Sequence, residues 1–394
     1  MGFFSGRVSY LRFKVEGDSP GIFGEEHLER LSNFRIGTQR VASADGVEVG
    51  WTAGEHLLDT RFDLAKNIIN DTMQFALRID ANKLPADLLR AYTAIELQAL
   101  ASKNPSGLPS AKQKREAREA ARQRLEEEAK DGRFLRRKVV PVLWDAISNE
   151  LLLGSSSVTI IDRLLVLFQN TFGVGFETLT AGTLAYRLAE SRSQTRGVDD
   201  ASPSPFVPGQ SASEVAWMLD EHSRDFLGNE FLLWLWFYLE NEDDTVKLQD
   251  GSEATIMLAS NLVLECPRAV TGRETITHEA PTRLPEAKRA IQAGKLPRKV
   301  GLIVVRHDAQ YELTLTAETM AVTGARMPAP EESEDRARLD ERVTQLRHLV
   351  ETLDLIYDVF GSRRASDDWS RELARMQKWL SREDRNGGRI SATA

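Results

Sequence analysis

Segment 111–138 constrains the fold most, because it combines strong helix propensity with very little apolar surface. It reads AKQKREAREAARQRLEEEAKDGRFLRRK and holds eleven basic and six acidic residues, a net charge of +5. The whole chain of 394 residues carries −8, so positive charge is concentrated here. Up to Ala129 the non-polar residues of the segment are alanines and Leu125, which favour a helix but bury little area. Such a helix has no broad apolar stripe for joining a core, and we expect it to project.

The charge of this basic segment has two explanations. A solvated helix with i,i+4 ion pairs is the first. The candidate pairs are Lys112–Glu116, Arg115–Glu119 and Arg122–Glu126. The second is a polyanion site, favoured by the net positive charge in an otherwise acidic chain. After Gly132 the bulky pair Phe134 and Leu135 lies among basic residues, and we interpret it as an apolar tip that packs on a partner or inserts at nucleic acid.

A second basic cluster spans 283–306 and holds seven basic residues and one acidic residue. Ordinary surface charge explains such a cluster when it occurs alone. Two basic clusters in one acidic chain favour a surface that follows phosphates. Ala293-Gly294-Lys295 within this cluster is not a nucleotide-binding loop, because it lacks both the leading glycine and the hydroxyl of that motif.

Signatures of enzymes and of metal sites are weak. The six histidines are scattered and the chain has one cysteine, Cys266, so a zinc site has no ligand set. An acidic group after a predicted helix could hold a divalent ion for a nuclease, although a solvated helix end explains it better. Its members are Glu240, Glu242, Asp243 and Asp244. We therefore predict no catalytic residues, no metal and no cofactor.

Composition indicates a cytoplasmic protein. The chain is 41% hydrophobic, and its longest apolar run, FLLWLWFYL at 231–239, is too short to cross a membrane. A single cysteine suits a reducing compartment, and Arg7 and Arg12 interrupt any apolar leader. We interpret Trp234 and Trp236 in the apolar run as core or interface residues, and the run itself as a candidate dimer surface.

Hydrophobic periodicity predicts an α+β fold with antiparallel sheets and flanking helices. Strands are expected at 8–15, 47–51, 75–79, 139–153 as a hairpin, 255–258, 262–265, 274–277, and 300–316 as a second hairpin. Helices are expected at 25–31, 86–100, 157–172, 226–238, 285–293, 334–360 and 367–380. Segment 191–213, rich in Ser and Pro, predicts a linker. The expected regions are 1–190 with a basic finger at 103–138, then 214–365, then a helical extension and disordered tail at 366–394.

The order of these segments resembles the RdgC family of bacterial recombination-associated proteins. The segments that carry the resemblance are SGRVSYLRFKV, VGWTAG, FALRIDANKLPADLLRAYTAIELQAL, the basic segment, PVLWDAISNELLL, AIQAGKLPRKVGLIVVRHDAQYELTL and VETLDLIYDVFGS. The resemblance covers most of 6–190 and 255–361. The stretch 181–250 is expanded relative to compact members, and 367–394 is additional.

The resemblance implies a protein without enzymatic activity that encircles duplex DNA as a homodimeric ring, without sequence preference. It further implies association with the nucleoid and antagonism of RecA in homologous recombination. The resemblance assigns closure of the ring to Phe134 or Leu135. The implied DNA-binding residues are Lys112, Lys114, Arg115, Arg118, Arg122, Arg133, Arg136, Arg137, Lys138, Lys295, Arg298 and Lys299. The alternatives are a metal-dependent nuclease, and a module that binds partner proteins through the basic segment and the apolar run.

Overall fold

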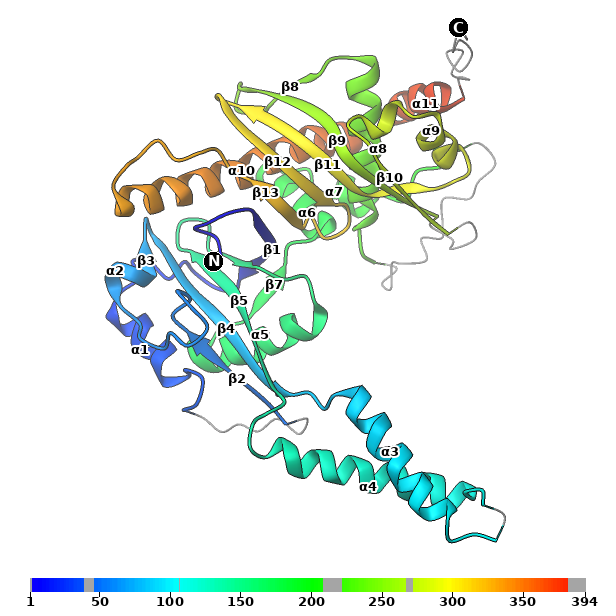
Figure 1. Ribbon diagram of the computed structural model, residues 1–394. Coiled ribbons are helices and arrows are strands. Elements are labelled where there is room, and N and C mark those ends of the chain that lie inside the picture. Colours follow the sequence, from blue (N-terminus) through cyan, green and yellow to red (C-terminus); the bar gives the residue numbers. More distant parts are fainter. Residues whose placement is uncertain (1, 39–45, 106, 208–221, 267–271, 382–394) are drawn as a thin grey trace, which may run out of the picture.

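The computed structural model describes residues 2–38, 46–105, 107–207, 222–266 and 272–381 (Figure 1). The end of the predicted linker, at 208–213, and the predicted tail from residue 382 lie outside these ranges. Within them the fold is α+β, as predicted, and its strands pair antiparallel throughout. The described residues form one sheet of thirteen strands: ten follow the order β10-β9-β11-β12-β13-β1-β6-β5-β4-β2, while β3, β7 and β8 pair with β4, β1 and β9 beside this path.

The strands are β1 (Val8–Val15), β2 (Val47–Thr52), β3 (Ile68–Ile69), β4 (Thr72–Asn82), β5 (Leu135–Asp145), β6 (Glu150–Leu153), β7 (Phe176–Thr178), β8 (Thr245–Lys247), β9 (Glu253–Glu265), β10 (Arg273–Thr277), β11 (Leu296–Arg306), β12 (Ala309–Thr316) and β13 (Val322–Arg326). The α-helices are α1 (Glu25–Asn33), α2 (Leu64–Asn67), α3 (Ala86–Ala101), α4 (Ala111–Ala129), α5 (Val158–Phe172), α6 (Ala181–Ser191), α7 (Thr195–Asp199), α8 (Phe226–Asn241), α9 (Pro285–Gln292), α10 (Asp335–Arg364) and α11 (Trp369–Leu380).

Strand β1 joins two halves of the sheet. Its beginning pairs with β13, through Val8 with Ala325 and Tyr10 with Val322. Its end pairs with β6, from Leu11 opposite Leu153 onward. The first strand of the described chain therefore lies in the middle of the sheet, between β6 of the N-terminal half and β13 of the C-terminal half (Figure 1).

The smaller hydrophobic core lies in the N-terminal half, where α1 and α5 cover one face of the sheet (Figure 1). Aromatic rings dominate it, with Trp51 against Phe75 at 5.0 Å and Trp144 against Phe168 at 5.1 Å between ring centroids. Edge-to-face packing of this kind stabilises a core beyond its buried area. Both tryptophans are on strands, since Trp51 belongs to β2 and Trp144 to β5.

The larger core lies in the C-terminal half and includes α8. Every residue of α8 from Phe226 to Tyr238 is buried, as expected for a mostly apolar helix, and the two polar ones are bonded: Asn229 to the Pro297 carbonyl and Glu230 to Arg364. Trp234 and Trp236 are therefore core residues, as predicted. The prediction that the run 231–239 is a dimer surface is wrong, because other elements of the same chain already cover it.

The described part of the predicted linker, 191–207, belongs to the larger core. It begins with the end of α6 and contains α7. Val198, Ala201 and Phe206 are buried in that core together with α6. A Ser- and Pro-rich composition indicates irregular backbone, and three apolar side chains suffice to fix that backbone onto a core.

Candidate nucleic-acid interface

Helices α3 and α4 form an antiparallel hairpin, here called the finger, that projects from the end of the N-terminal half (Figure 1). The finger is an insertion between β4 and β5. These two strands pair along their whole length, from Thr72 opposite Asp145 to Asn82 opposite Leu135. The finger therefore rises directly from two neighbouring strands of the sheet.

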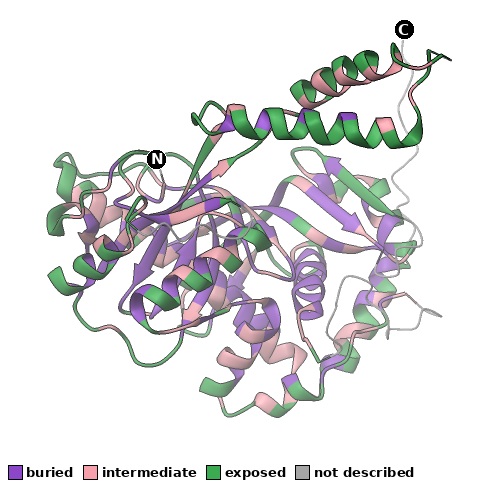
Figure 2. Ribbon diagram, turned by 90° about the horizontal axis from the view of Figure 1, so that it is seen from below, coloured by how far each residue is buried: buried purple, intermediate pink, exposed green. Residues whose placement is uncertain are grey.

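A narrow seam of three alanines and one leucine on α4 faces α3. Ala117, Ala121, Leu125 and Ala129, each four positions after the last, are the buried residues of α4. Spacing of four residues places them along one side of the helix, facing α3. The sequence indicated correctly that α4 cannot join a core, but the helix does not project alone. The other sides of α4 are exposed (Figure 2).

Side-chain contacts fix both ends of the finger. At the turn between the helices, Ser110 and Gln113 form a reciprocal capping box, and Gln113 also bonds Asn104. At the base, the Tyr92 hydroxyl donates to the Glu128 carboxylate at 2.9 Å, which raises the pKa of Tyr92. The Arg124 guanidinium lies over the Tyr92 ring, 4.1 Å from its centroid.

The basic residues of the finger differ in whether carboxylates neutralise them. Two of the three predicted i,i+4 pairs are present, Lys112–Glu116 at 3.8 Å and Arg122–Glu126 at 2.8 Å. Arg133 is also paired, with Asp131 at 2.5 Å, and this guanidinium lowers the pKa of Asp131. Among the described residues, no carboxylate pairs with Lys114, Arg115 or Arg118.

Four cations gather on one side of α4 and form what we call the basic stripe. Lys114, Arg118 and Arg122 follow one another at intervals of four residues, and Arg115 lies beside them. All four are exposed. From Lys114 to Arg122 the stripe extends roughly 12 Å along the helix axis. Three of its four charges are free to neutralise phosphates.

More cations lie at the base of the finger. Arg136 and Lys138 are exposed on one face of β5, since alternate residues of a strand share a face. Arg137 points to the opposite face, where Asp80 lies 3.4 Å away and also binds Arg78. The sequence prediction omitted two further exposed cations, Lys83 just after β4 and Lys130 just after α4.

Phe134 and Leu135 lie at the base of the finger, so the prediction that they form its tip is wrong. The backbone of Phe134 accepts a hydrogen bond from Lys83 N–H, and Leu135 is the first residue of β5. Leu108, in the turn between the helices, is the apolar residue at the tip and is 72% exposed. Leu88 and Ile95 on α3 are exposed as well.

Of the three implied DNA-binding residues in the second basic cluster, Lys295 and Arg298 are held by carboxylates. Lys295 is only 4% exposed and its ammonium is paired with Glu274. Arg298 bridges Glu265 at 3.0 Å and Glu318 at 2.7 Å. Lys299 is exposed. The sequence predicted that Lys295, Arg298 and Lys299 act together with the finger. Their placement does not support this, because Lys295 and Arg298 are bound to carboxylates within the C-terminal half.

The acidic group considered for a nuclease is also occupied by protein contacts. The Glu240 carboxylate accepts from Trp236 and from Trp379, the latter at 2.9 Å. Glu242 pairs with Arg363 at 3.5 Å and with Arg375 at 2.9 Å. Within the described ranges, three or more potential metal ligands do not come together anywhere.

Comparison with models of known protein families gave no match, and comparison with curated proteins gave none. The described helices include none with the length and apolar character needed to cross a membrane.

Proposed function

We propose that the protein binds duplex DNA without sequence preference, as a homodimeric ring, and modulates RecA-dependent homologous recombination at the nucleoid without catalysing a reaction. The observation that supports this proposal most is the basic stripe on a rigid, projecting finger. The stripe residues Lys114, Arg115 and Arg118 keep their charges available although the chain as a whole is acidic. An acidic exterior repels DNA, which favours contact at the finger alone.

The affinity of such an interface comes from the release of counterions. The logarithm of the binding constant falls by about 0.9 per neutralised phosphate for each tenfold rise in salt. Contacts of this kind position a protein on the backbone but do not read bases. Exposed lysines and arginines on a helix, without a set of hydrogen-bonding groups arranged to read base edges, fit binding of any sequence.

Ring formation requires a contact between two copies of the chain. We assign this contact to Leu108 at the tip of the finger, in place of Phe134 and Leu135. This assignment rests on position, because an exposed apolar residue at the end of a projecting arm is placed to contact a second copy. The resemblance to RdgC proteins supports the ring and the antagonism of RecA.

The test is the salt dependence of duplex binding. The variant carries Lys114→Glu, Arg115→Glu and Arg118→Glu. We expect much weaker binding and a salt slope smaller by about 2.7, because three phosphate contacts are lost. The control changes charge by the same amount at exposed sites away from the finger: Arg196→Glu, Arg338→Glu and Arg371→Glu. Equal losses of affinity and of salt slope in the two variants would mean that the finger does not contact DNA.

Antagonism of RecA is tested separately, by strand exchange between a single-stranded circle and a linear duplex. The wild-type protein is expected to slow the exchange, and the finger variant is expected to have little effect. If the variant inhibits as strongly as the wild type, the action on recombination does not depend on DNA contact by the finger.

A further inference from the structure

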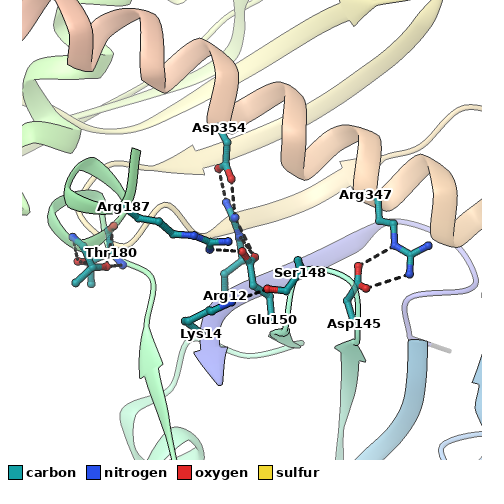
Figure 3. A network of polar contacts seen from close by, with 10 residues as sticks. Arg12, Lys14, Asp145, Ser148, Glu150, Thr180, Arg187, Arg347 and Asp354 are labelled. Carbon is teal, nitrogen blue, oxygen red and sulfur yellow. Dashed lines mark hydrogen bonds and ion pairs between the residues drawn. The ribbon is translucent and has the colours of Figure 1, made fainter. Parts of the chain in front are cut away.

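A cavity of about 610 Å³ lies between the sheet and α10, where the two halves of the molecule meet. Leu143 and Leu152 line it from β5 and β6, and Val350 lines it from α10. Sites for small molecules usually have volumes of 300–1,000 Å³, with mostly apolar walls and a few polar groups. Figure 3 shows the polar groups that surround this cavity on the strands and on α10.

Two ion pairs connect α10 to the strands beside the cavity. Arg347 of α10 binds Asp145 at 2.8 Å, and Asp354 of α10 binds Arg12 at 2.5 Å. Arg347 and Asp354 are two helical turns apart, roughly 10.5 Å along the axis, so they lie on the same face of α10. Val350 is between them on that face. The ion pairs hold the helix to the sheet at two points and leave an aliphatic surface between them.

The three arginines of the cavity differ in how far the protein uses their hydrogen-bond donors. Arg12 binds both Glu150 and Asp354 and is buried, and Arg347 binds Asp145 and Asn70. Arg187 donates through one nitrogen to Glu150, and within the described ranges its guanidinium makes no other hydrogen bond. Its side chain is 40% exposed. A guanidinium has five N–H donors, so most of those of Arg187 are available to a ligand.

Acidic and basic groups alternate at this end of the cavity. Arg12 and Arg187 line it together with Glu150, Asp354 and Asp358, Asp358 is paired with Arg192, and Lys14 lies next to the lining. Lys14 donates to the Ser148 carbonyl at 2.7 Å, and its pKa is lowered by burial and by repulsion from Arg187. The unused N–H donors of Arg187, and not a net positive charge of the cavity, favour an anionic head group beside this residue.

We propose that the cavity binds a small amphipathic anion, with its charged head on Arg187 and its apolar body against Leu143, Leu152 and Val350. The guanidinium suits a carboxylate or a sulfonate, because its paired N–H groups match two oxygens of such a head group. The aliphatic walls suit a hydrocarbon body. This proposal does not depend on DNA binding by the finger.

Calorimetric titration of the full chain tests the head group with three probes of equal tail length: decanoate, decanol and decyltrimethylammonium. We expect decanoate to bind at least about tenfold more tightly than decanol, as charge-assisted hydrogen bonds imply. The cation should bind more weakly than both. Equal affinity for the three probes, or no heat from any of them, would overturn the proposal.

Two variants locate the site. Arg187→Gln is expected to reduce decanoate affinity to that of decanol and to leave decanol unchanged, while Arg196→Gln, at a residue 93% exposed on α7, changes neither. Val350→Trp fills the cavity and should abolish binding of all three probes. Melting curves check that each variant folds. Retained preference for decanoate in Arg187→Gln would place the anion elsewhere and contradict the assignment.

Discussion

Asn82 at the end of β4 pairs with Leu135 at the start of β5, although the entire finger lies between them in the sequence. The pairing means that the finger emerges from a closed strand pair instead of from a loose loop. Both of its helices are tied to neighbouring strands, so the finger has a fixed direction relative to the sheet. A rigid arm loses little conformational entropy when it binds, which favours affinity.

The seam of the finger should not accept a larger side chain. We expect Ala121→Leu to destabilise the finger by about 1–3 kcal/mol, because Ala121 is completely buried between α3 and α4. Hydrogen exchange should then accelerate in α3 and α4 and remain unchanged in α8. Ala120→Leu is the matched control, since Ala120 is exposed on the same helix. Equal effects of the two substitutions would mean that α3 and α4 do not pack along this seam.

The tip of the finger should control association of two copies. We expect Leu108→Glu to weaken the dimer at least about tenfold, because a charge replaces an apolar contact at its centre. Sedimentation equilibrium measures this directly. Ile22→Glu serves as control, since Ile22 is 87% exposed and lies outside the finger. A dimer that survives Leu108→Glu unchanged, or a monomeric wild-type protein, would rule out closure through the tip.

Lys295 should be dispensable for DNA binding. We expect Lys295→Met to leave duplex affinity and salt slope unchanged, because the ammonium is buried against Glu274. The free energy of unfolding should change by less than about 1 kcal/mol, since removing the cation also removes its desolvation cost. Filter binding and urea unfolding measure the two quantities. A salt slope smaller by about 0.9 in the variant would mean that Lys295 contacts a phosphate and would contradict this prediction.

Acid should weaken the junction between the two halves. Burial raises the pKa of Glu150, but the charges of Arg12 and Arg187 more than offset this and hold it below the ordinary value. The unfolded chain therefore takes up the proton first, at about pH 4.3. The stabilisation by the ion pairs of Glu150 is complete above that pH. It is lost as the pH falls through the lower pKa that Glu150 has in the folded state.

The variant Glu150→Gln isolates this contribution. We expect its free energy of unfolding to fall less steeply with acid than that of the wild type, and to be lower at pH 7, where the ion pairs are intact. Urea unfolding at several pH values between 3 and 7 measures both. Parallel pH curves for the two proteins would contradict a depressed pKa at Glu150.

Local patterns in the sequence predicted much of the secondary structure. The hairpin of β11 and β12 follows from two alternating runs around His307 and Asp308, both of which have positive φ, as a tight turn requires. Helix α8 follows from an unbroken apolar run. In contrast, the two short strands expected at 255–258 and 262–265 are one strand, β9, irregular near Ser260, where φ is 66°. The positive φ of a serine is not visible in composition.

The candidate site was harder to predict, because ion pairs depend on strand order. Lys295 meets Glu274, and Arg298 meets Glu265 and Glu318, only after β9, β10 and β11 are aligned. Counting the basic residues of segment 283–306 therefore overestimates the positive charge that is available to a ligand. On α4 the partners are local, so the i,i+4 rule predicted two pairs correctly. The basic segment alone could not locate the tip of the finger. The tip is the turn between α3 and α4, and α3 precedes the basic segment in the sequence.

The central position of β1 affects the order in which the chain can fold during synthesis. Translation produces β1 first, but its neighbours β6 and β13 follow much later, and β13 comes near the end. Contacts this distant in sequence slow folding, since loop closure must precede them. Until β13 emerges, the beginning of β1 has an open edge that could pair with another chain. Cutting the protein between its halves would leave the same edge of β1 without its partner.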